Sequence, residues 1–464
     1  MVHASPDPSL ATLDVYANGR RADDLPFGQA TGVFKVAMNQ RVDIAPADST
    51  GTNSSLALAP PPAQPSRVLL VVRGVLGTGF DTSVNDTTLT LDSVEGYLEE
   101  PSSAGALELL LYHAVPDAPA VSVGLQESPD VAAPSPLFSN VGYGGFSGYE
   151  AGALGTNPLD VYAASSGVRV ASVQTSSGLA LPASEGFSSG AVALVATGFL
   201  DPMANMGGTS SPGAGLQVLA VFADGTVRPL DAAARLQLVH ASVEAPTSVD
   251  VYLAEAGATS LGTLEVNNLG YQSATPFRSY VSGVPVLVQL TEGSSTSIAA
   301  SVELTPEAGV SARWVAVGDP AGGAAPLTVV SAASDSEVAV GTGIDVQLFH
   351  ASTDAGEVDV HFHQSLSPGP SELSNPVLMD FAYATPTATL TGETLQDFVV
   401  SLTAPNITSM SLVDFNTGLT TFSLASSGES VFFLVMGSAS GSAADLDLVV
   451  VGNDGRRGDP INGQ

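Results

Sequence analysis

The chain has 464 residues, with 46 acidic and 13 basic side chains, and its formal net charge is -33. So few cations exclude nucleic-acid binding, because neutralising phosphates needs a basic patch; the charge favours cations, Ca²⁺ above all, as small partners. The chain has no cysteine, which excludes disulfides and thiolate metal sites. It also has no apolar run of membrane-spanning length, so we expect no transmembrane segment.

Four copies of one block pattern run along the chain. Each copy opens with a His-Ala dipeptide, and an acid follows the histidine four residues later. Repeats at intervals of about a hundred residues or more have the size of domains, so we expect one folded domain per copy. The histidines and their acids are His3 with Asp7, His113 with Asp117, His240 with Glu244, and His350 with Asp354.

Three further blocks follow each histidine in the same order. In copy one, an alternating strand at Leu13–Ala17 would place Asp14 and Tyr16 on the face opposite its apolar residues. An aromatic block follows at Leu25–Gly28, and then a continuous apolar run at Val68–Val72, which is typical of a buried strand. The later copies carry these blocks at Val121–Leu125, Val141–Tyr143 and Val192–Ala196; at Val249–Leu253, Leu269–Tyr271 and Trp314–Val317; and at Val358–Phe362, Phe381–Tyr383 and Val431–Val435.

Residues that favour turns separate these blocks. The chain has 48 Gly and 31 Pro, and short strands with a turn signal every 8–12 residues or so indicate a sandwich or barrel. We therefore predict an all-β fold of four tandem antiparallel β-sandwich (Ig-like) domains. The predicted domains are residues 1–104, 105–233 with an insertion near 203–215, 234–342, and 343–464, the last of which ends in a C-terminal tail.

The block order resembles a known family. Residues 3–8 (HASPDP) with 13–16 (LDVY), and residues 239–246 (VHASVEAP) with 249–252 (VDVY), are similar to the domain-of-unknown-function family 4397 in four tandem copies. Copy two departs with Ser122 in place of the strand aspartate, and copy four with His361 in place of the tyrosine. The resemblance implies a β-sandwich that is extracellular or in the cell envelope. It implies no chemistry, since the family has no established activity.

The repeated histidines allow two interpretations. A histidine with a carboxylate four residues away could act as a base or a metal ligand. A histidine at a strand end could instead hold the following turn by hydrogen bonds. The Pro and Asp residues of that turn favour the structural role, and we predict it for all four histidines and their acids.

Two weaker metal candidates lie near the C-terminus. His361 and His363 share one face of a strand with Asp359, so a third ligand would make a zinc site possible; the alternative is an exposed polar face. The oxygen-rich stretch with Asn453, Asp454 and Asp459 is the best calcium candidate, although it lacks the spacing and the closing glutamate of a calcium loop. No other cofactor is expected.

The sequence predicts no enzyme. It has no serine nucleophile elbow and no His-Glu-x-x-His motif, and its only lysine, Lys35, is not in a phosphate-binding loop. We expect an extracellular or surface-displayed structural or adhesive protein that forms fibres, coats or spacers. The alternative is an array of modules that bind glycans, proteins or calcium once per domain.

The first strand suggests self-association. Copies two to four approach their histidine through a long strand, whereas only Met1 and Val2 precede His3. Either an upstream segment, such as a signal peptide and a leading strand, precedes Met1, or the first domain lacks part of an edge. In the second case the short strand would leave backbone groups of its neighbour unpaired and open to strand addition from another chain. The segment 452–464, expected beyond the last strand, is a candidate linker. This predicts head-to-tail contact between the first and fourth domains of successive chains and an open filament.

Overall fold

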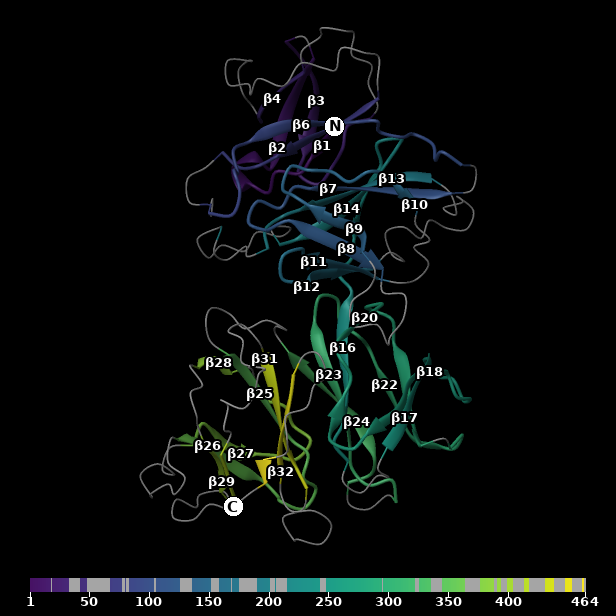
Figure 1. Cartoon of the computed structure of the whole chain (residues 1–464), viewed down its shortest axis with the longest axis vertical. Coiled ribbons are helices and arrows are strands. Elements are labelled where there is room, and N and C mark those ends of the chain that lie inside the picture. Colours follow the sequence, from purple (N-terminus) through teal and green to yellow (C-terminus); the bar gives the residue numbers. More distant parts are fainter. Residues whose placement is uncertain are drawn as a thin grey trace. The chain divides into compact units, whose positions relative to one another are not determined.

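The computed structural model divides into two compact units, Met1–Ala233 (unit 1) and Ala234–Gln464 (unit 2), each described by itself (Figure 1). No helix in the described part of the chain is long and apolar enough to cross a membrane. The described residues are 1–17, 19–32, 42–47, 67–76, 80, 83–103, 106–125, 136–151, 158–167, 169–174, 190–200, 205, 215–242, 248–293, 295–321, 325–334, 344–363, 376–387, 390–393, 399–403, 413–416, 430–437, 447–452 and 461–462.

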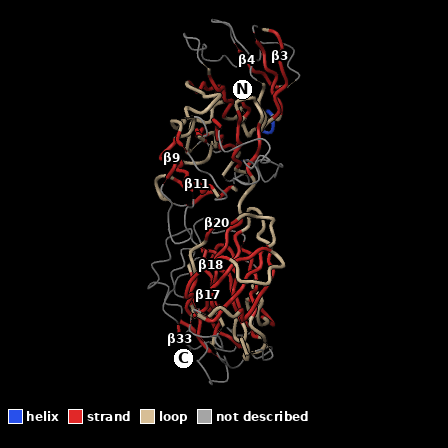
Figure 2. Tube along the Cα trace, turned by 90° about the vertical axis from the view of Figure 1, so that its right-hand side faces the viewer, coloured by secondary structure: helices blue, strands red, loops and turns tan. Residues whose placement is uncertain are grey.

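The fold is all-β, as predicted. Apart from the 3-10 turn η1 (Pro8–Leu10), the elements assigned within these ranges are strands (Figure 2). They form several small sheets, which the chain builds two at a time. In each such sheet pair we call the sheet with the histidine strand the His sheet and the other the outer sheet.

Unit 1 holds the first two sheet pairs. In the first, the His sheet is β1 (Val2–His3), β5 (Val68–Arg73) and β6 (Thr90–Glu95), and the outer sheet is β3 (Arg20–Pro26), β2 (Thr12–Ala17) and β4 (Val42–Pro46). In the second, the His sheet is β10 (Glu150–Ala151), β7 (Leu107–His113), β13 (Gly190–Thr197), β14 (Gln217–Phe222) and β15 (Val227–Leu230), and the outer sheet is β12 (Arg169–Val173), β11 (Leu159–Ala163), β8 (Val121–Leu125) and β9 (Pro136–Val141).

Unit 2 repeats this plan. In the third pair, the His sheet is β19 (Ser273–Ala274), β16 (Ala234–His240), β23 (Ser311–Val317) and β24 (Thr328–Ser334), with β20 (Arg278–Tyr280) also on β16, and the outer sheet is β18 (Thr263–Gly270), β17 (Ser248–Glu255), β21 (Val286–Glu292) and β22 (Ile298–Leu304). In the fourth, the His sheet is β28 (Leu390–Glu393), β25 (Ile344–His350), β31 (Ser430–Met436), β32 (Asp447–Val451) and β33 (Ile461–Asn462), and the outer sheet is β27 (Leu378–Phe381), β26 (Val358–His363), β29 (Val399–Thr403) and β30 (Val413–Asn416).

The expectation that all strands are antiparallel is wrong. In each pair the histidine strand runs parallel to the late apolar strand, as β1 does to β5, β7 to β13, β16 to β23, and β25 to β31. Parallel neighbours need a long crossover, and here the outer sheet forms between them. Local alternation of apolar and polar residues does not encode strand direction, so the sequence blocks could not reveal this pairing.

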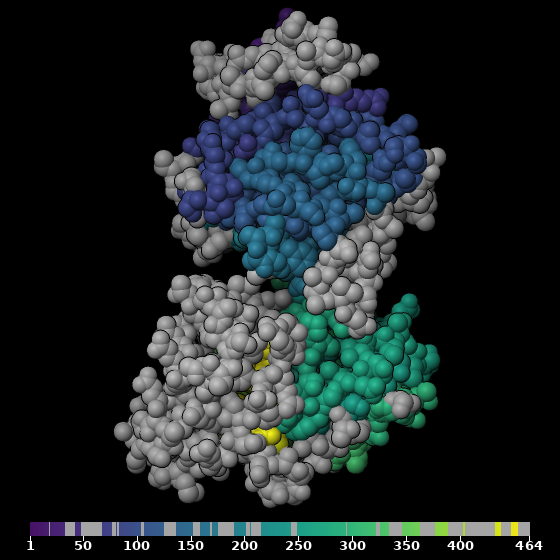
Figure 3. All heavy atoms as spheres, in the orientation of Figure 1, coloured from purple at the N-terminus to yellow at the C-terminus, as the bar shows by residue number. Residues whose placement is uncertain are grey.

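The His sheets are buried on both faces. In β7, Leu109 and Leu111 pack with outer-sheet residues such as Val123, whereas Leu110 and Tyr112 pack against the His sheet of the first pair. The same shared core joins the third and fourth pairs. This double burial explains why the late strands are apolar throughout. Figure 3 shows the two pairs of unit 1, coloured purple to teal, in direct contact on the face displayed.

Both ends of the chain pair with their own sheets. The outer edge of β1 is bonded to the chain that follows β3, since Gln29 accepts from the His3 N–H and Thr31 donates its N–H to Met1. The segment 452–464 does not lie wholly beyond the last strand, because Ile461–Asn462 forms β33 on β32. The expected free linker is therefore wrong for these two residues.

Candidate functional site

The four repeated histidines occupy one structural position. Each ends the first strand of its His sheet, opposite a residue of the late apolar strand. Each is fully buried. The register partners are Val72 for His3, Ala196 for His113, Ala316 for His240, and Val435 for His350.

Backbone groups of the following turn engage both ring nitrogens. Nε2 of His3 lies 2.6 Å from the carbonyl oxygen of Leu10, and its Nδ1 accepts the Ser5 N–H at 3.3 Å. A carbonyl oxygen can only accept, so Nε2 carries the proton and the ring is neutral. The same two bonds form at His113, with Pro119 O at 3.0 Å and Val115 N at 3.3 Å, and at His350, with Gly356 O at 2.8 Å and Ser352 N at 3.2 Å.

Burial keeps these rings neutral. Desolvation lowers the pKa of His3 and of His113 to about 4, against a smaller opposing effect of the backbone carbonyls. The pKa of His350 is lowered for the same reason. A base with such a pKa is weak at neutral pH, and a metal would have to displace the backbone bonds. The arrangement suits a structural role.

The acids of the repeat hold backbone amides. Asp7 accepts the Ser9 N–H and the Leu76 N–H, each at 2.8 Å. Asp117 accepts the Leu200 N–H and the Asn205 side-chain amide, also at 2.8 Å each. These bonds tie the histidine turn to the loop after the late apolar strand. In the fourth pair Asp354 accepts from the Ser352 hydroxyl at 3.1 Å; Glu244 lies outside the described residues.

A left-handed residue follows the aromatic block in every pair. Gly28, Gly144, Gln272 and Ala384 all have positive φ angles, from 56° to 72°. Each donates its N–H to the carbonyl of the repeat histidine, at 2.7–2.9 Å. The aromatic residues just before them, Phe27, Tyr143, Tyr271 and Tyr383, meet the imidazoles nearly edge to face. The sequence pattern does not reveal this feature, because two of the four left-handed positions are not glycine.

Replacing Gly28 with alanine tests the left-handed conformation. A Cβ at Gly28 would meet nothing within 4 Å, so only backbone strain opposes the change, and we expect a loss of roughly 1–2 kcal/mol in unfolding free energy. Gly32, which lies beside β1 in the same pair with equal space and no positive φ, is the matched control, and Gly32→Ala should cost nothing. Hydrogen exchange of β1 and β5 measures both variants. Equal effects would contradict the assignment.

Tyr383 offers a second test. Its hydroxyl is buried and has no hydrogen-bond partner in the described part of the chain, and the first pair has Phe27 at this position. Tyr383→Phe should therefore leave the stability of unit 2 unchanged or raise it by up to about 1 kcal/mol. Tyr280→Phe, which removes a hydroxyl bound to Glu265 at 2.5 Å, should lower it. Urea unfolding followed by the single tryptophan, Trp314, compares the two variants.

A glycine after each late apolar strand completes the motif. Gly74, Gly198, Gly318 and Gly437 have φ angles between 90° and 97°. A Cβ on Gly74 or Gly318 would come within 2.4 Å of a backbone oxygen. The Ser5 hydroxyl donates to Gly74 O at 2.5 Å, and Ser242 makes the same bond to Gly318 O. This glycine recurs in the sequence one or two residues after the apolar run and could have been found there.

The exposed polar face given as the alternative for His361, His363 and Asp359 is wrong for His361 and Asp359, which are buried. Asp14, Asp250 and Asp359 are all buried. Asp250 accepts the Asn268 N–H at 2.7 Å and Asp359 accepts the Asp380 N–H at 2.8 Å. The donors have positive φ and lie where the strand register shifts, so these carboxylates hold β-bulges.

Ser122, which stands where the other copies have an aspartate, keeps this role. The Ser122 hydroxyl accepts the Asn140 N–H at 3.1 Å, and Asn140 is also left-handed, with φ 53°. A hydroxyl oxygen thus replaces the carboxylate in the second pair. Copy one differs, since Asp14 binds Arg21 Nη2 at 2.8 Å.

The structure brings no metal centre together in the part that it describes. There, no group of three or more His, Cys, Asp or Glu side chains is placed to hold a metal ion. His361 is buried, with Nε2 3.1 Å from the Thr403 hydroxyl. The side chain of His363 lies outside the described residues, as do Asn453, Asp454 and Asp459.

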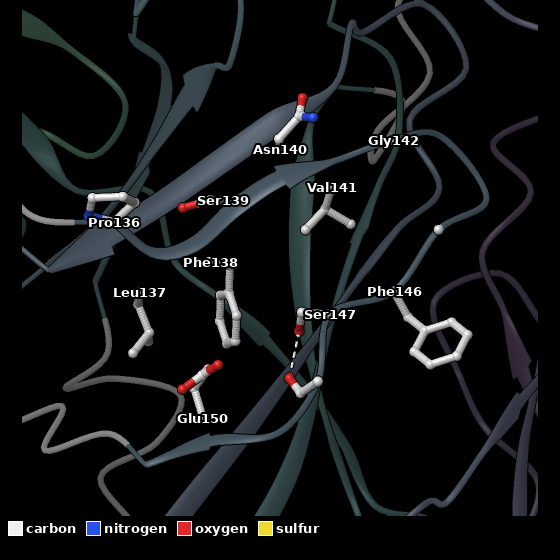
Figure 4. A pocket seen from close by; sticks show the side chains of 12 residues that line it. Pro136, Leu137, Phe138, Ser139, Asn140, Val141, Gly142, Phe146, Ser147 and Glu150 are labelled. Atoms are coloured by element: carbon white, nitrogen blue, oxygen red, sulfur yellow. Dashed lines mark hydrogen bonds between the residues drawn. The ribbon is translucent and has the colours of Figure 1, made fainter.

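One open hollow lies in the second pair. It has a volume of ≈ 580 Å³ and lies between β9 and the segment 142–150 (Figure 4). Asn140, Ser147 and Glu150 contribute polar groups, and Phe146 is 47% exposed beside it. Ser147 already accepts the Leu111 N–H and donates to Gly148 O, each at 2.8 Å. The hollow is thus a gap between two sheet edges whose polar groups partly serve the fold.

Comparison with known proteins identifies part of the chain. Residues 234–361 match the family described as "Domain of unknown function (DUF4397)". The span covers the third sheet pair and continues through β25 into β26. The comparison with curated proteins gives no match. Among solved structures, "The Bacillus anthracis TIE protein" aligns over 94% of this chain and 72% of its own, at 8% identity and a TM-score of 0.14, a value too low to indicate a shared fold.

Proposed function

We propose that the four sheet pairs are four tandem copies of one Ig-like β-sandwich domain, of which residues 234–361 include the family match. The repeated bonding supports this. The histidine, the left-handed residue that donates to its carbonyl, and the positive-φ glycine after the late strand recur in all four pairs. Four sequences that keep the same hydrogen bonds at the same positions point to one ancestral unit, although their outer sheets differ.

We further propose that the protein is a non-enzymatic structural or adhesive protein of the cell surface or extracellular space. The observation that carries this is the use of the repeated histidines. They are the residues best suited to chemistry, and their ring nitrogens bind backbone groups of their own turn in three of the pairs. Repeated, charge-poor β domains suit spacers, coats and fibres.

Assembly would proceed by strand addition between chains. Among the described residues, β1 pairs with β5 only at Val71 and Val72, and we propose the side of β5 at Val68–Leu70 as the edge at which a strand of another chain adds. A head-to-tail contact at this edge would give an open filament.

Electron microscopy of the native material at the cell surface tests the structural role. Filaments or a regular coat that antibodies to this chain label would support it. Compact single particles at all concentrations would contradict it. In that case the binding-module alternative is tested by a glycan array and by calorimetry with CaCl₂, where saturable binding at a stoichiometry near one per sheet pair would favour that function instead.

A further inference from the structure

In each unit, the two sheet pairs pack against each other through the same face of their His sheets. In unit 1, three positions of the first pair pack against the same three positions of the second, namely Val2, Ala4 and Val71 against Tyr112, Ala114 and Val195. In unit 2, Val239, Ala241 and Val315 pack against Phe349, Ala351 and Leu434. Two copies that meet through the same surface form an isologous interface, as in a two-fold dimer.

Such a face raises a problem of selectivity. It is apolar in all four pairs, and apolar burial does not distinguish one partner from another. The His sheet of the second pair could therefore bind that of the third, or the corresponding face of another chain. Correct pairing needs a feature that only the proper partner satisfies.

Unit 2 carries a buried cation within this interface. Arg313 is fully buried on β23. Its Nε donates to Gln237 in its own pair at 2.9 Å, and its Nη1 donates to Gln347 of the fourth pair at 3.2 Å. The guanidinium lies 4.7 Å from the ring centre of Phe432, also in the fourth pair. Partners from both copies thus solvate the charge.

Unit 1 has a different cation at a different position. Nε of Arg73 lies 2.5 Å from Asp92, and the Tyr112 hydroxyl of the second pair donates to the same carboxylate oxygen at 2.5 Å. The Arg73 guanidinium lies 4.6 Å from the ring centre of Tyr143, also in the second pair. The two units therefore share their apolar contacts and differ in their polar ones.

We propose that Arg313 and Arg73 are specificity-determining residues that select which sheet pair each His sheet binds. The second pair has Leu110 and Ala193 where the fourth has Gln347 and Phe432. If the third pair bound the second pair, Arg313 would be buried against Leu110 and Ala193. It would lose the amide oxygen of Gln347 and the ring of Phe432, and burying a charge without such partners is costly. The third and fourth pairs have Val239 and Phe349 at the position of Tyr112. If the first pair bound either of them, no hydroxyl would donate to Asp92.

The test measures mispairing in the full-length protein. The chain is unfolded in urea and refolded at a series of concentrations, and light scattering after size exclusion gives the multimer fraction relative to the same sample before unfolding. The first variant combines Gln237→Leu, Arg313→Ala and Gln347→Leu, which gives unit 2 the residues of the second pair. The second variant, Tyr112→Phe, removes one bond across the unit 1 interface. Tyr280→Phe is the matched control, because it removes a tyrosine–carboxylate bond beside an arginine within a single pair.

Refolded wild type should return to its starting multimer fraction. We expect the triple variant to exceed it by roughly tenfold and Tyr112→Phe to exceed it by less, while Tyr280→Phe matches wild type. If the triple variant fails to fold, the test rests on the multimer fraction of Tyr112→Phe compared with that of Tyr280→Phe. Return of Tyr112→Phe to the wild-type fraction, or an equal rise with Tyr280→Phe, would overturn the proposal.

Discussion

Replacing His113 with alanine is expected to lower the local unfolding free energy of the second sheet pair by about 3–4 kcal/mol. The substitution removes the acceptor of the Val115 N–H and the donor to Pro119 O. Val115 is buried and Pro119 is partly buried, and a cavity the size of an imidazole remains beside Tyr143. The loss therefore combines a packing term with two unpaired backbone groups.

Hydrogen exchange measured by mass spectrometry locates this effect. Amides of β7 and β13 should exchange faster in His113→Ala, while peptides from residues 234–361 in the same sample serve as the internal reference. His113→Gln, which keeps a polar side chain of similar length, should lose less. A loss below about 0.5 kcal/mol in the alanine variant would mean that solvent or a rearranged turn replaces the ring.

Acidification should destabilise unit 1 well before most carboxylates are neutralised. The pKa of His3 and of His113 is about 4 in the folded chain and about 6.5 in an unfolded one. Between these values the unfolded state binds more protons, so stability is full above pH 6.5 and falls as the pH drops towards 4. The shift corresponds to about 3 kcal/mol for each histidine.

The double variant His3→Phe with His113→Phe isolates the histidine contribution. We subtract the unfolding free energy of unit 1 in the variant from that in wild type, both measured in urea. Between pH 6.5 and 4 this difference should change with pH by an amount that corresponds to two protons. The carboxylates titrate in both proteins, so their contribution cancels. A difference that does not vary with pH over this range would show that the folded histidines titrate normally.

Local patterns predicted the strands well and their environment poorly. The apolar run at Val192–Ala196 forms a buried strand, because length and hydrophobicity are local properties. The aspartate of Val249–Leu253 was placed on the correct face, but alternation does not tell whether that face meets water. Here Asp250 is buried because it holds the bulge at Asn268, a contact with the next strand that no local pattern contains.

An identical string shows the same limit. Residues 13–17 and 159–163 both read LDVYA. The first forms β2, which directly follows the histidine turn, whereas the second forms β11, three strands after β8, the strand that follows the turn in that pair. Each keeps the same local cluster, since Asp14 binds Arg21 at 2.8 Å and Asp160 binds Arg169 at 3.4 Å. A short string therefore specifies its own neighbourhood, and its place in the sheet depends on the rest of the chain.

The parallel pairing of β7 with β13 also bears on how the chain is made. During synthesis β7 leaves the ribosome long before β13, because the whole outer sheet is encoded between them. Non-local pairing of this kind raises contact order and slows folding. Each nascent histidine strand therefore spends that interval with apolar side chains on both faces and no final neighbour, and this is the period in which a chaperone would protect it.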